Sequence, residues 1–147
     1  MSIIDELITD RTYGDVTSGN AKGRYDYRDY NRVGQAINYV AAEVGGLSIT
    51  AKTNWINTDI PKNSDMTAYR GYVQTILDTT GVVRPIPTTN NAILTITGAN
   101  QIEQALYDTH RLLQNMMRWN DLDRLSESWD TLDSKQLTWG AWFPKPN

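Results

Sequence analysis

The chain has 147 residues, of which 39% are hydrophobic and 21% are charged, and it contains no cysteine. This is the composition of a folded domain rather than of a disordered chain, and the lack of thiols excludes disulfide bonds, thiolate metal sites and cysteine nucleophiles. The net charge of -3 and the pI near 5.0 argue against a nucleic-acid-binding protein, which would carry a basic face.

Neither a membrane span nor a secretion signal is expected. No run of the chain approaches the ~20 apolar residues that a span needs. The start, MSIIDE, holds two acids and no base, unlike the basic start of a secretion signal. Five tryptophans and eight tyrosines stand against one phenylalanine. Such rings favour surfaces that become buried on binding, although a tyrosine-rich core would also account for them.

The N-terminal region gives mixed signals. One short helical face would hold Ile3, Ile4, Leu7 and Ile8. Residues 17–23, with the sequence TSGNAKG, have the composition of a loop. We therefore expect a short helical turn followed by a loop.

The first firm helix is predicted from Tyr27 to Val44. Asp26 precedes it and can cap it, because an aspartate side chain accepts hydrogen bonds from the free N–H groups of a helix start. Gly45 and Gly46 follow it and supply the stop. Apolar residues recur at steps of three and four and form one stripe: Tyr30, Val33, Ile37, Val40, Ala41 and Val44.

The middle of the chain predicts a short strand, a loop and a second helix. Residues 47–51 alternate between apolar and polar types, as a strand does, and residues 52–62 are expected to form an ordered loop. The second helix should begin after Asn63 or Ser64, either of which can cap it, and end at Gly81. Its apolar stripe consists of Met66, Tyr69, Val73, Ile76 and Leu77.

An extended stretch over residues 82–89 leads to the longest predicted helix, from about residue 98 to residue 119. Thr97 is its expected cap, and residues 92–96 are either a strand or an apolar approach to it. Its buried side should carry Ile102, Leu106, Thr109, Leu113, Met116 and Met117. The three stripes predict a mainly α fold, in which a three-helix core with antiparallel neighbours and short extended or β segments forms a helical domain over residues 1–118.

A change of pattern marks a C-terminal extension after residue 118. Trp119, Trp129 and Trp139 are spaced ten residues apart. The first two begin Trp-x-x-Leu-Asp units, which place Leu122 and Leu132 three positions after their tryptophans. Each unit would present one Trp-Leu pair on one side of a short helical turn.

These pairs are expected to be buried against another surface. Ser128 can cap a turn that begins at Trp129. Units this short do not bury such pairs alone, and the aromatic end of the chain would be adhesive if exposed. The sequence leaves open whether residues 119–147 pack on their own domain or on another subunit. The contact residues expected in this extension are Trp119, Leu122, Trp129, Leu132, Trp139, Trp142 and Phe143.

Residues with catalytic or metal-binding chemistry are sparse. The single histidine, His110, has Asp108 two positions away, and side chains at that spacing point in different directions on a helix. The acids after residue 120 lack the glycine and the closing glutamate of a calcium loop. We therefore expect no catalytic, cofactor-binding or metal-binding residues and no enzymatic activity.

A basic and aromatic patch lies between Lys22 and Arg32. Such a mixture can bind single-stranded nucleic acid, but Asp26 and Asp29 interrupt it and the whole chain is acidic. Tyrosine and arginine are also common anchors of protein interfaces, so contact with protein is the better expectation. The contact residues expected here are Tyr25, Tyr27 and Arg28.

Four stretches of the chain carry a resemblance to a known family. They are Leu7-Ile8-Thr9-Asp10-Arg11-Thr12 with Asp15-Val16; Ala21-Lys22-Gly23-x-Tyr25 leading into Asp29-Tyr30-Asn31-Arg32-Val33-Gly34-x-Ala36-Ile37-x-Tyr39; Lys52-Thr53-Asn54-Trp55 with Asp59-Ile60-Pro61 and Met66-x-x-Tyr69; and Ala99-Asn100-Gln101-Ile102-Glu103. In their order and spacing they resemble small structural proteins encoded in the tail or baseplate regions of prophages from Gram-positive, gut-type bacteria. The tandem Trp-x-x-Leu-Asp units resemble short repeats near the ends of such proteins. Asn54 departs from the aspartate, and Lys62 from the capping threonine, that the family pattern has there.

The resemblance implies a non-enzymatic part of a phage particle, assembled in the cytoplasm of the host bacterium. Its partners would be other virion proteins and copies of itself in a symmetric oligomer. Exposed aromatic rings beside Asp and Asn leave an alternative, a carbohydrate- or receptor-binding module of a phage tail. A cell-wall hydrolase that uses acids and His110 is a third hypothesis. The position in the particle stays open between tail, baseplate, fibre adaptor and head.

Overall fold

The computed structural model describes residues 2–87 and 95–133, with side chains described up to residue 116. The described backbone is mainly helical and has no strand, which confirms the predicted α class. The chain divides into two compact units, Met1–Arg111 and Leu112–Asn147. The predicted division into a helical domain over residues 1–118 and a contact-forming extension over residues 119–147 stays a prediction.

Three short helices open the first unit: η1 (Ile3–Glu6), α1 (Tyr13–Ser18) and η2 (Ala21–Gly23). The loop predicted over residues 17–23 is therefore wrong for most of its length. The reason is local capping. The hydroxyl of Thr12 accepts a hydrogen bond from the backbone N–H of Asp15, whose carboxylate accepts one from the N–H of Thr12. The N–H of Gly23 donates in turn to the side-chain oxygen of Asn20.

The next two helices are long, and their bounds agree closely with the predicted ones. The first, α2 (Tyr27–Val44), has the predicted bounds, because Asp26 caps its start and Gly45, with a positive φ of 79°, ends it. The second, α3 (Asn63–Thr80), starts at a residue expected to precede it. Its N-cap is Lys62, whose N–H donates to the carboxylate of Asp65. Gly81 ends this helix in the left-handed conformation, as predicted.

The last helix, α4 (Ile96–Asp133), is longer at both ends than the sequence predicts. Its start is capped by Thr95 rather than Thr97, because the hydroxyl of Thr95 accepts a hydrogen bond from the N–H of Gly98. At its far end, the two complete Trp-x-x-Leu-Asp units are helix rather than separate capped turns. Ser128 lies inside this helix and is therefore not an N-cap, which corrects the expected turn at Trp129.

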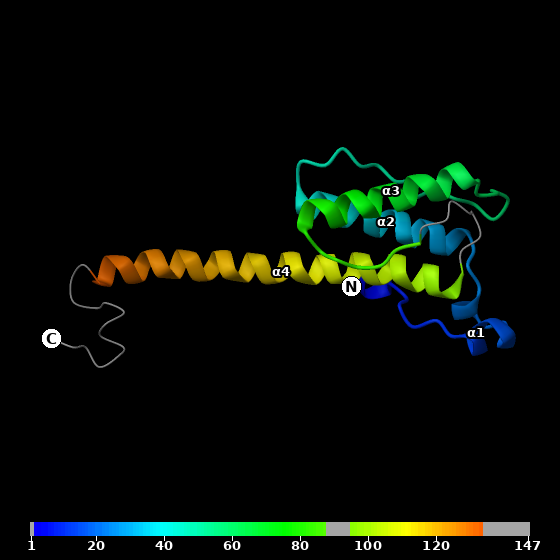
Figure 1. Cartoon of the computed structure of the whole chain (residues 1–147), viewed down its shortest axis with the longest axis horizontal. Coiled ribbons are helices and arrows are strands. Elements are labelled where there is room, and N and C mark those ends of the chain that lie inside the picture. Colours follow the sequence, from blue (N-terminus) through cyan, green and yellow to red (C-terminus); the bar gives the residue numbers. More distant parts are fainter. Residues whose placement is uncertain (1, 88–94, 134–147) are drawn as a thin grey trace. The chain divides into compact units, whose positions relative to one another are not determined.

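The long helices of the first unit run in the same direction, which corrects the expected antiparallel arrangement (Figure 1). Contacts follow the same order along α2 and α4, since Arg32 pairs with Glu103 and, further along both helices, Glu43 lies beside His110. The connections must therefore return along the bundle. At residues 45–62 and 81–95 they are far longer than the 2–8 residues that join antiparallel helices.

The first returning connection is held to α2 by two asparagines instead of by strand pairing. Asn38 both donates to the carbonyl and accepts from the N–H of Ala51. Asn31, nearly two turns earlier, does the same for Trp55. The strand predicted for residues 47–51 is therefore wrong, because the backbone groups of Ala51 bond to the side chain of Asn38 and not to another strand.

The core of the first unit lies between α2, α3 and the first part of α4. The predicted stripes of the first two helices are largely confirmed, except that Val44 is only partly buried. On α4 the expected burial of Met116 is wrong, since this side chain is 52% exposed, and Met117 falls outside the described side chains. The largest fully buried apolar side chains are Ile4, Ile37, Met66, Ile76, Ile102 and Leu106.

Candidate functional site

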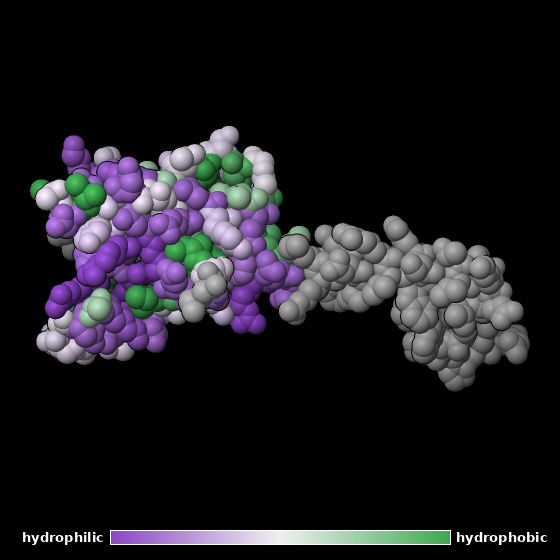
Figure 2. All heavy atoms as spheres, turned by 180° about the vertical axis from the view of Figure 1, so that it is seen from behind, coloured by the Kyte–Doolittle hydropathy of each residue, from purple (hydrophilic) through white to green (hydrophobic). Residues whose placement is uncertain are grey.

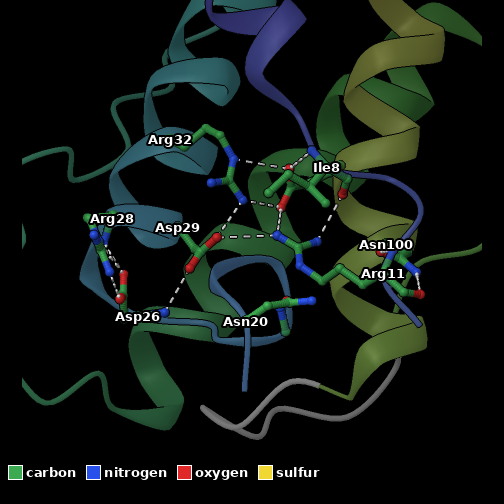
Figure 3. Close-up of polar contacts among 10 residues, drawn as sticks. Ile8, Arg11, Asn20, Asp26, Arg28, Asp29, Arg32 and Asn100 are labelled. Atoms are coloured by element: carbon green, nitrogen blue, oxygen red, sulfur yellow. Dashed lines mark hydrogen bonds and ion pairs between the residues drawn. The ribbon is translucent and has the colours of Figure 1, made fainter. Parts of the chain in front are cut away.

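A buried cluster of four charges joins three separate parts of the first unit (Figure 3). Arg11 comes from the N-terminal segment, Asp29 and Arg32 from α2, and Glu103 from α4. One oxygen of Glu103 lies 2.7 Å from Arg11 and 2.8 Å from Arg32. The nearer oxygen of Asp29 lies 3.3 Å from Arg11 and 2.6 Å from Arg32. The two cations balance the two anions, which makes the cluster electrically neutral.

Glu103 is the centre of this charge cluster. It is fully buried, and its second oxygen accepts hydrogen bonds from the backbone N–H of Ile8 and from Nε of Arg32. Burial alone would lower the pKa of Arg32, but the hydrogen bonds and charges of Glu103 and Asp29 outweigh it and raise that pKa above its usual value. Both carboxylate oxygens of Glu103 thus bond to groups of the same chain, which indicates that Glu103 stabilises the contact of α4 with α2 and the N-terminal segment.

The same cluster fixes the extended N-terminal segment across the bundle. Asn100 accepts from the N–H of Arg11 and donates to its carbonyl, so one α4 side chain holds both backbone groups. The guanidinium of Arg11 also donates to the carbonyl of Ile8. Because few apolar side chains of this segment are buried apart from Ile4, polar contacts carry most of its attachment.

An aromatic cluster lies on the other side of α2, around the hydroxyl of Tyr69. This hydroxyl accepts a hydrogen bond from the indole N–H of Trp55 and lies 2.5 Å from the carbonyl oxygen of Lys52. The ring of Tyr30 packs against both aromatic rings. Burial raises the pKa of Tyr69 to about 12, although the hydrogen bond from Trp55 acts in the opposite direction. The neutral phenol therefore joins α3 to the returning connection.

Of the three contact residues predicted near the start of α2, the structure uses two internally. The ring of Tyr25 packs edge-on against Tyr30, and burial, with the charges of Glu103 and Asp29, raises its pKa well above the usual value. The guanidinium of Arg28 binds Asp26 at 2.7 Å and thereby supports the N-cap of its own helix. Tyr27 lies beside Arg28 and is partly exposed.

The predicted contact residues of the C-terminal extension fall into two groups. Trp119, Leu122, Trp129 and Leu132 lie on the helical backbone of α4, in the second unit. Trp139, Trp142 and Phe143 lie outside the described residues. Four of the predicted contact residues are therefore placed on one continuous helix.

His110 has a structural partner. Its Nδ1 lies 2.7 Å from a carboxylate oxygen of Glu43, and its ring packs near that of Tyr39. Within the described ranges, no group of three or more histidine, aspartate or glutamate side chains is arranged to hold a metal ion. No helix in this part of the chain is long and apolar enough to cross a membrane.

The surface of the first unit carries its apolar residues in separate spots. The face in Figure 2 is mainly hydrophilic, with hydrophobic residues scattered over it rather than joined. Among the described residues of this unit, the most exposed large apolar side chains are Val83, Ile60 and Tyr13. Single exposed apolar residues are common on soluble proteins and do not by themselves mark a binding face.

A shallow pocket lies between the N-terminal segment, the second returning connection and α4. Arg84 is on its rim, and the Nε atom of this residue lies 2.5 Å from a carboxylate oxygen of Asp108. Most of the lining residues have hydroxyl or amide side chains and none is aromatic, although the surface that they expose to the pocket is more apolar than polar: Thr9, Arg84, Pro85, Thr97, Asn100, Gln101 and Gln104.

Comparisons of the chain with protein families, with curated proteins and with solved structures found no match.

Proposed function

We propose that this chain is a structural or adaptor protein of a bacteriophage particle, of the tail or baseplate type, that acts by binding other protein subunits. The observation that carries the proposal is the distal part of α4. Leu112–Asn147 is a unit by itself, and its described backbone is a single helix. Isolated helices are marginal in water and gain most of their stability by packing an apolar face. The tryptophan and leucine residues of this helix supply such a face for a partner.

The first unit supports the proposal through the residues that hold it together. The four stretches that resemble phage proteins contain the members of the charge cluster and of the aromatic cluster. These clusters fasten segments to one another, with their polar groups bonded inside the chain. The residues that carry the resemblance are therefore ones that stabilise the fold, as expected of a subunit whose role is to bind other subunits in an assembly.

The proposal implies that the protein is part of purified particles. We expect mass spectrometry of particles from the bacterial strain that carries the gene to find it in a fixed ratio to the other structural proteins. As a control, a chain that ends at Arg118 should accumulate in the cell lysate yet be missing from the particles. Full-length protein that is abundant in the lysate and absent from the particles would contradict the proposal.

A further inference from the structure

The shallow pocket beside the first turns of α4 has walls that are fastened in place. Its floor is one face of that helix, and its walls are the N-terminal segment at Thr9 and the second returning connection at Arg84. Asn100 holds the first wall by both backbone groups of Arg11, and Asp108 binds the second wall through Arg84. The space between them is about 240 Å³, which is small for a drug-sized molecule.

Three polar side chains of the pocket have no hydrogen-bonding partner among the described residues. They are the hydroxyl groups of Thr9 and Thr97 and the amide group of Gln101. Each of these groups can both donate and accept a hydrogen bond. Arg84 carries the positive charge of the lining, and Asp108 offsets it, so no net charge attracts a free anion. The pocket therefore favours an uncharged ligand that offers donors and acceptors together.

The backbone of both walls offers groups of the same kind. In the described ranges, the N–H and carbonyl groups of Thr9 and Arg84 make no hydrogen bond. Both walls run antiparallel to α4, since Ile8 bonds to Glu103 before Arg11 bonds to Asn100, and the connection passes from Asp108 towards the start of α4. An irregular segment with unpaired backbone groups can bond to a further extended segment laid beside it.

The chain itself shows how its helices hold extended segments. Asn31, Asn38 and Asn100 each donate to the carbonyl and accept from the N–H of one residue in such a segment. An amide side chain can do this because, like a peptide group, it offers both a donor and an acceptor. Gln101 directly follows Asn100 and has the same amide group. It can therefore hold a peptide in the same manner.

We propose that this pocket binds a short extended peptide of a partner subunit, held through its backbone by Gln101 and by the hydroxyl groups of Thr9 and Thr97. The lining exposes more apolar than polar surface, which suits a small apolar side chain beside the peptide groups. None of the lining residues supplies an aromatic ring on which a sugar could stack. The inference rests on the proposed function and gives its first unit a contact surface of its own.

Binding of an uncharged model peptide to the full chain tests the inference. In nuclear magnetic resonance spectra, N-acetyl-trialanine amide should shift the signals of the pocket residues, and the shifts should saturate at millimolar concentration. Gln101→Ala should weaken this binding about fivefold, the equivalent of one hydrogen bond. Since the Gln101 side chain makes no bond within the described fold, the variant should keep the thermal midpoint of the natural chain.

Gln35→Ala is the matched control for this experiment. Gln35 is an exposed residue of α2 and does not line the pocket, so its replacement should leave the affinity for the peptide unchanged. Absence of saturable shifts in the natural chain would overturn the inference. An equal loss of affinity in the two variants would do the same.

Two other ligand classes are tested in the same spectra. N-acetylglucosamine represents a sugar and inorganic phosphate represents an anion. Both should bind more weakly than the model peptide, because the pocket has neither a stacking ring nor a net charge. Tighter binding of either one would assign the pocket to that ligand class and refute the peptide.

These outcomes are separate from those of the particle experiment. A chain that is present in purified particles but does not bind the model peptide would overturn the assignment of the pocket and leave the structural role intact. A chain that binds the peptide through Gln101 but is missing from particles would contradict the structural role instead.

Discussion

Glu103 is the residue whose loss the first unit should tolerate least. Its carboxylate neutralises Arg11 and Arg32 in a place from which water is excluded. Glu103→Gln keeps the shape of the side chain but leaves two guanidinium groups opposite Asp29 alone. Breaking a buried ion pair by removing one partner costs about 3–5 kcal/mol. We expect the free energy of unfolding to fall by that amount, measured by urea denaturation followed by circular dichroism.

An exposed ion pair in the same segment supplies the control. Lys22 and Asp10 lie 2.8 Å apart, but the side chain of Asp10 is 75% exposed. Pairs in water contribute about 0–1 kcal/mol, so Asp10→Asn should change the stability little. If Glu103→Gln were as mild as Asp10→Asn, the charge cluster would not be a main fastening of the fold.

This charge cluster could be predicted only in part from the sequence. Asp29 and Arg32 stand out in a basic and aromatic stretch, which favours interpreting them as surface residues. Their partner Glu103 is 71 positions from Arg32, and no local pattern links the two. Glu103 directly follows the buried Ile102 in the longest predicted helix. A charge beside an apolar stripe is common on any amphipathic helix, so this neighbour does not reveal that Glu103 is buried.

At the scale of elements, the sequence predicts best where the ends are chemically marked. Asp26, Gly45 and Gly81 fix three helix ends, since capping and left-handed geometry depend on a few neighbouring residues. The short helix α1 escapes prediction because it has no buried residue and so no apolar periodicity. The length of α4 could not be predicted, because the ten-residue spacing of the tryptophans favours separate short turns, whereas the structure has one continuous helix.

A glycine inside α2 makes an element-scale prediction that opposes helix propensity. A Cβ added at Gly34 would lie 2.3 Å from the carbonyl oxygen of Lys52 and 2.8 Å from the hydroxyl of Tyr69. Alanine normally stabilises a helix by up to about 1 kcal/mol relative to glycine. Here the backbone of the returning connection would have to move, at a cost of about 1–3 kcal/mol. We expect Gly34→Ala to lower the thermal midpoint, measured by calorimetry.

Gly71 on α3 is the matched control. Nothing lies within 4 Å of a Cβ added there. Gly71→Ala should therefore stabilise the protein by about 0.5–1 kcal/mol, as in an exposed helix. If both substitutions shifted the thermal midpoint in the same direction, the close contact between α2 and the returning connection would be refuted.

At the scale of the whole molecule, the direction of the helices was predicted wrongly although the sequence held the needed information. Three apolar stripes favour a bundle, and bundles are commonly antiparallel. The segments between the predicted helices, however, are long enough to span a helix of the length of α2, about 27 Å at 1.5 Å per residue. Segment length was therefore a better guide to direction than the number of helices.

The division into two units predicts that the first one folds without most of the second. Among residues with described side chains, those that are buried range from Ile4 to Thr109. A chain that ends at Arg118 keeps all of them and keeps Trp55 as its only tryptophan. The fluorescence of Trp55 then reports the aromatic cluster directly. We expect one cooperative thermal transition, within about 4 °C of the first-unit transition in the full chain, because a shift of that size corresponds to about 1 kcal/mol or less.

The mass of the same shortened chain completes the prediction. Because Leu122 to Leu132 are removed, light scattering should give a monomer at concentrations where the full chain is an oligomer. A cooperative monomer would mean that stability resides in the first unit and association in the second. A chain that loses its transition would instead mean that residues after Arg118 stabilise the core, since Arg11, Glu103 and the aromatic cluster are all retained. In that case the tryptophan repeat acts within its own chain before it acts between chains.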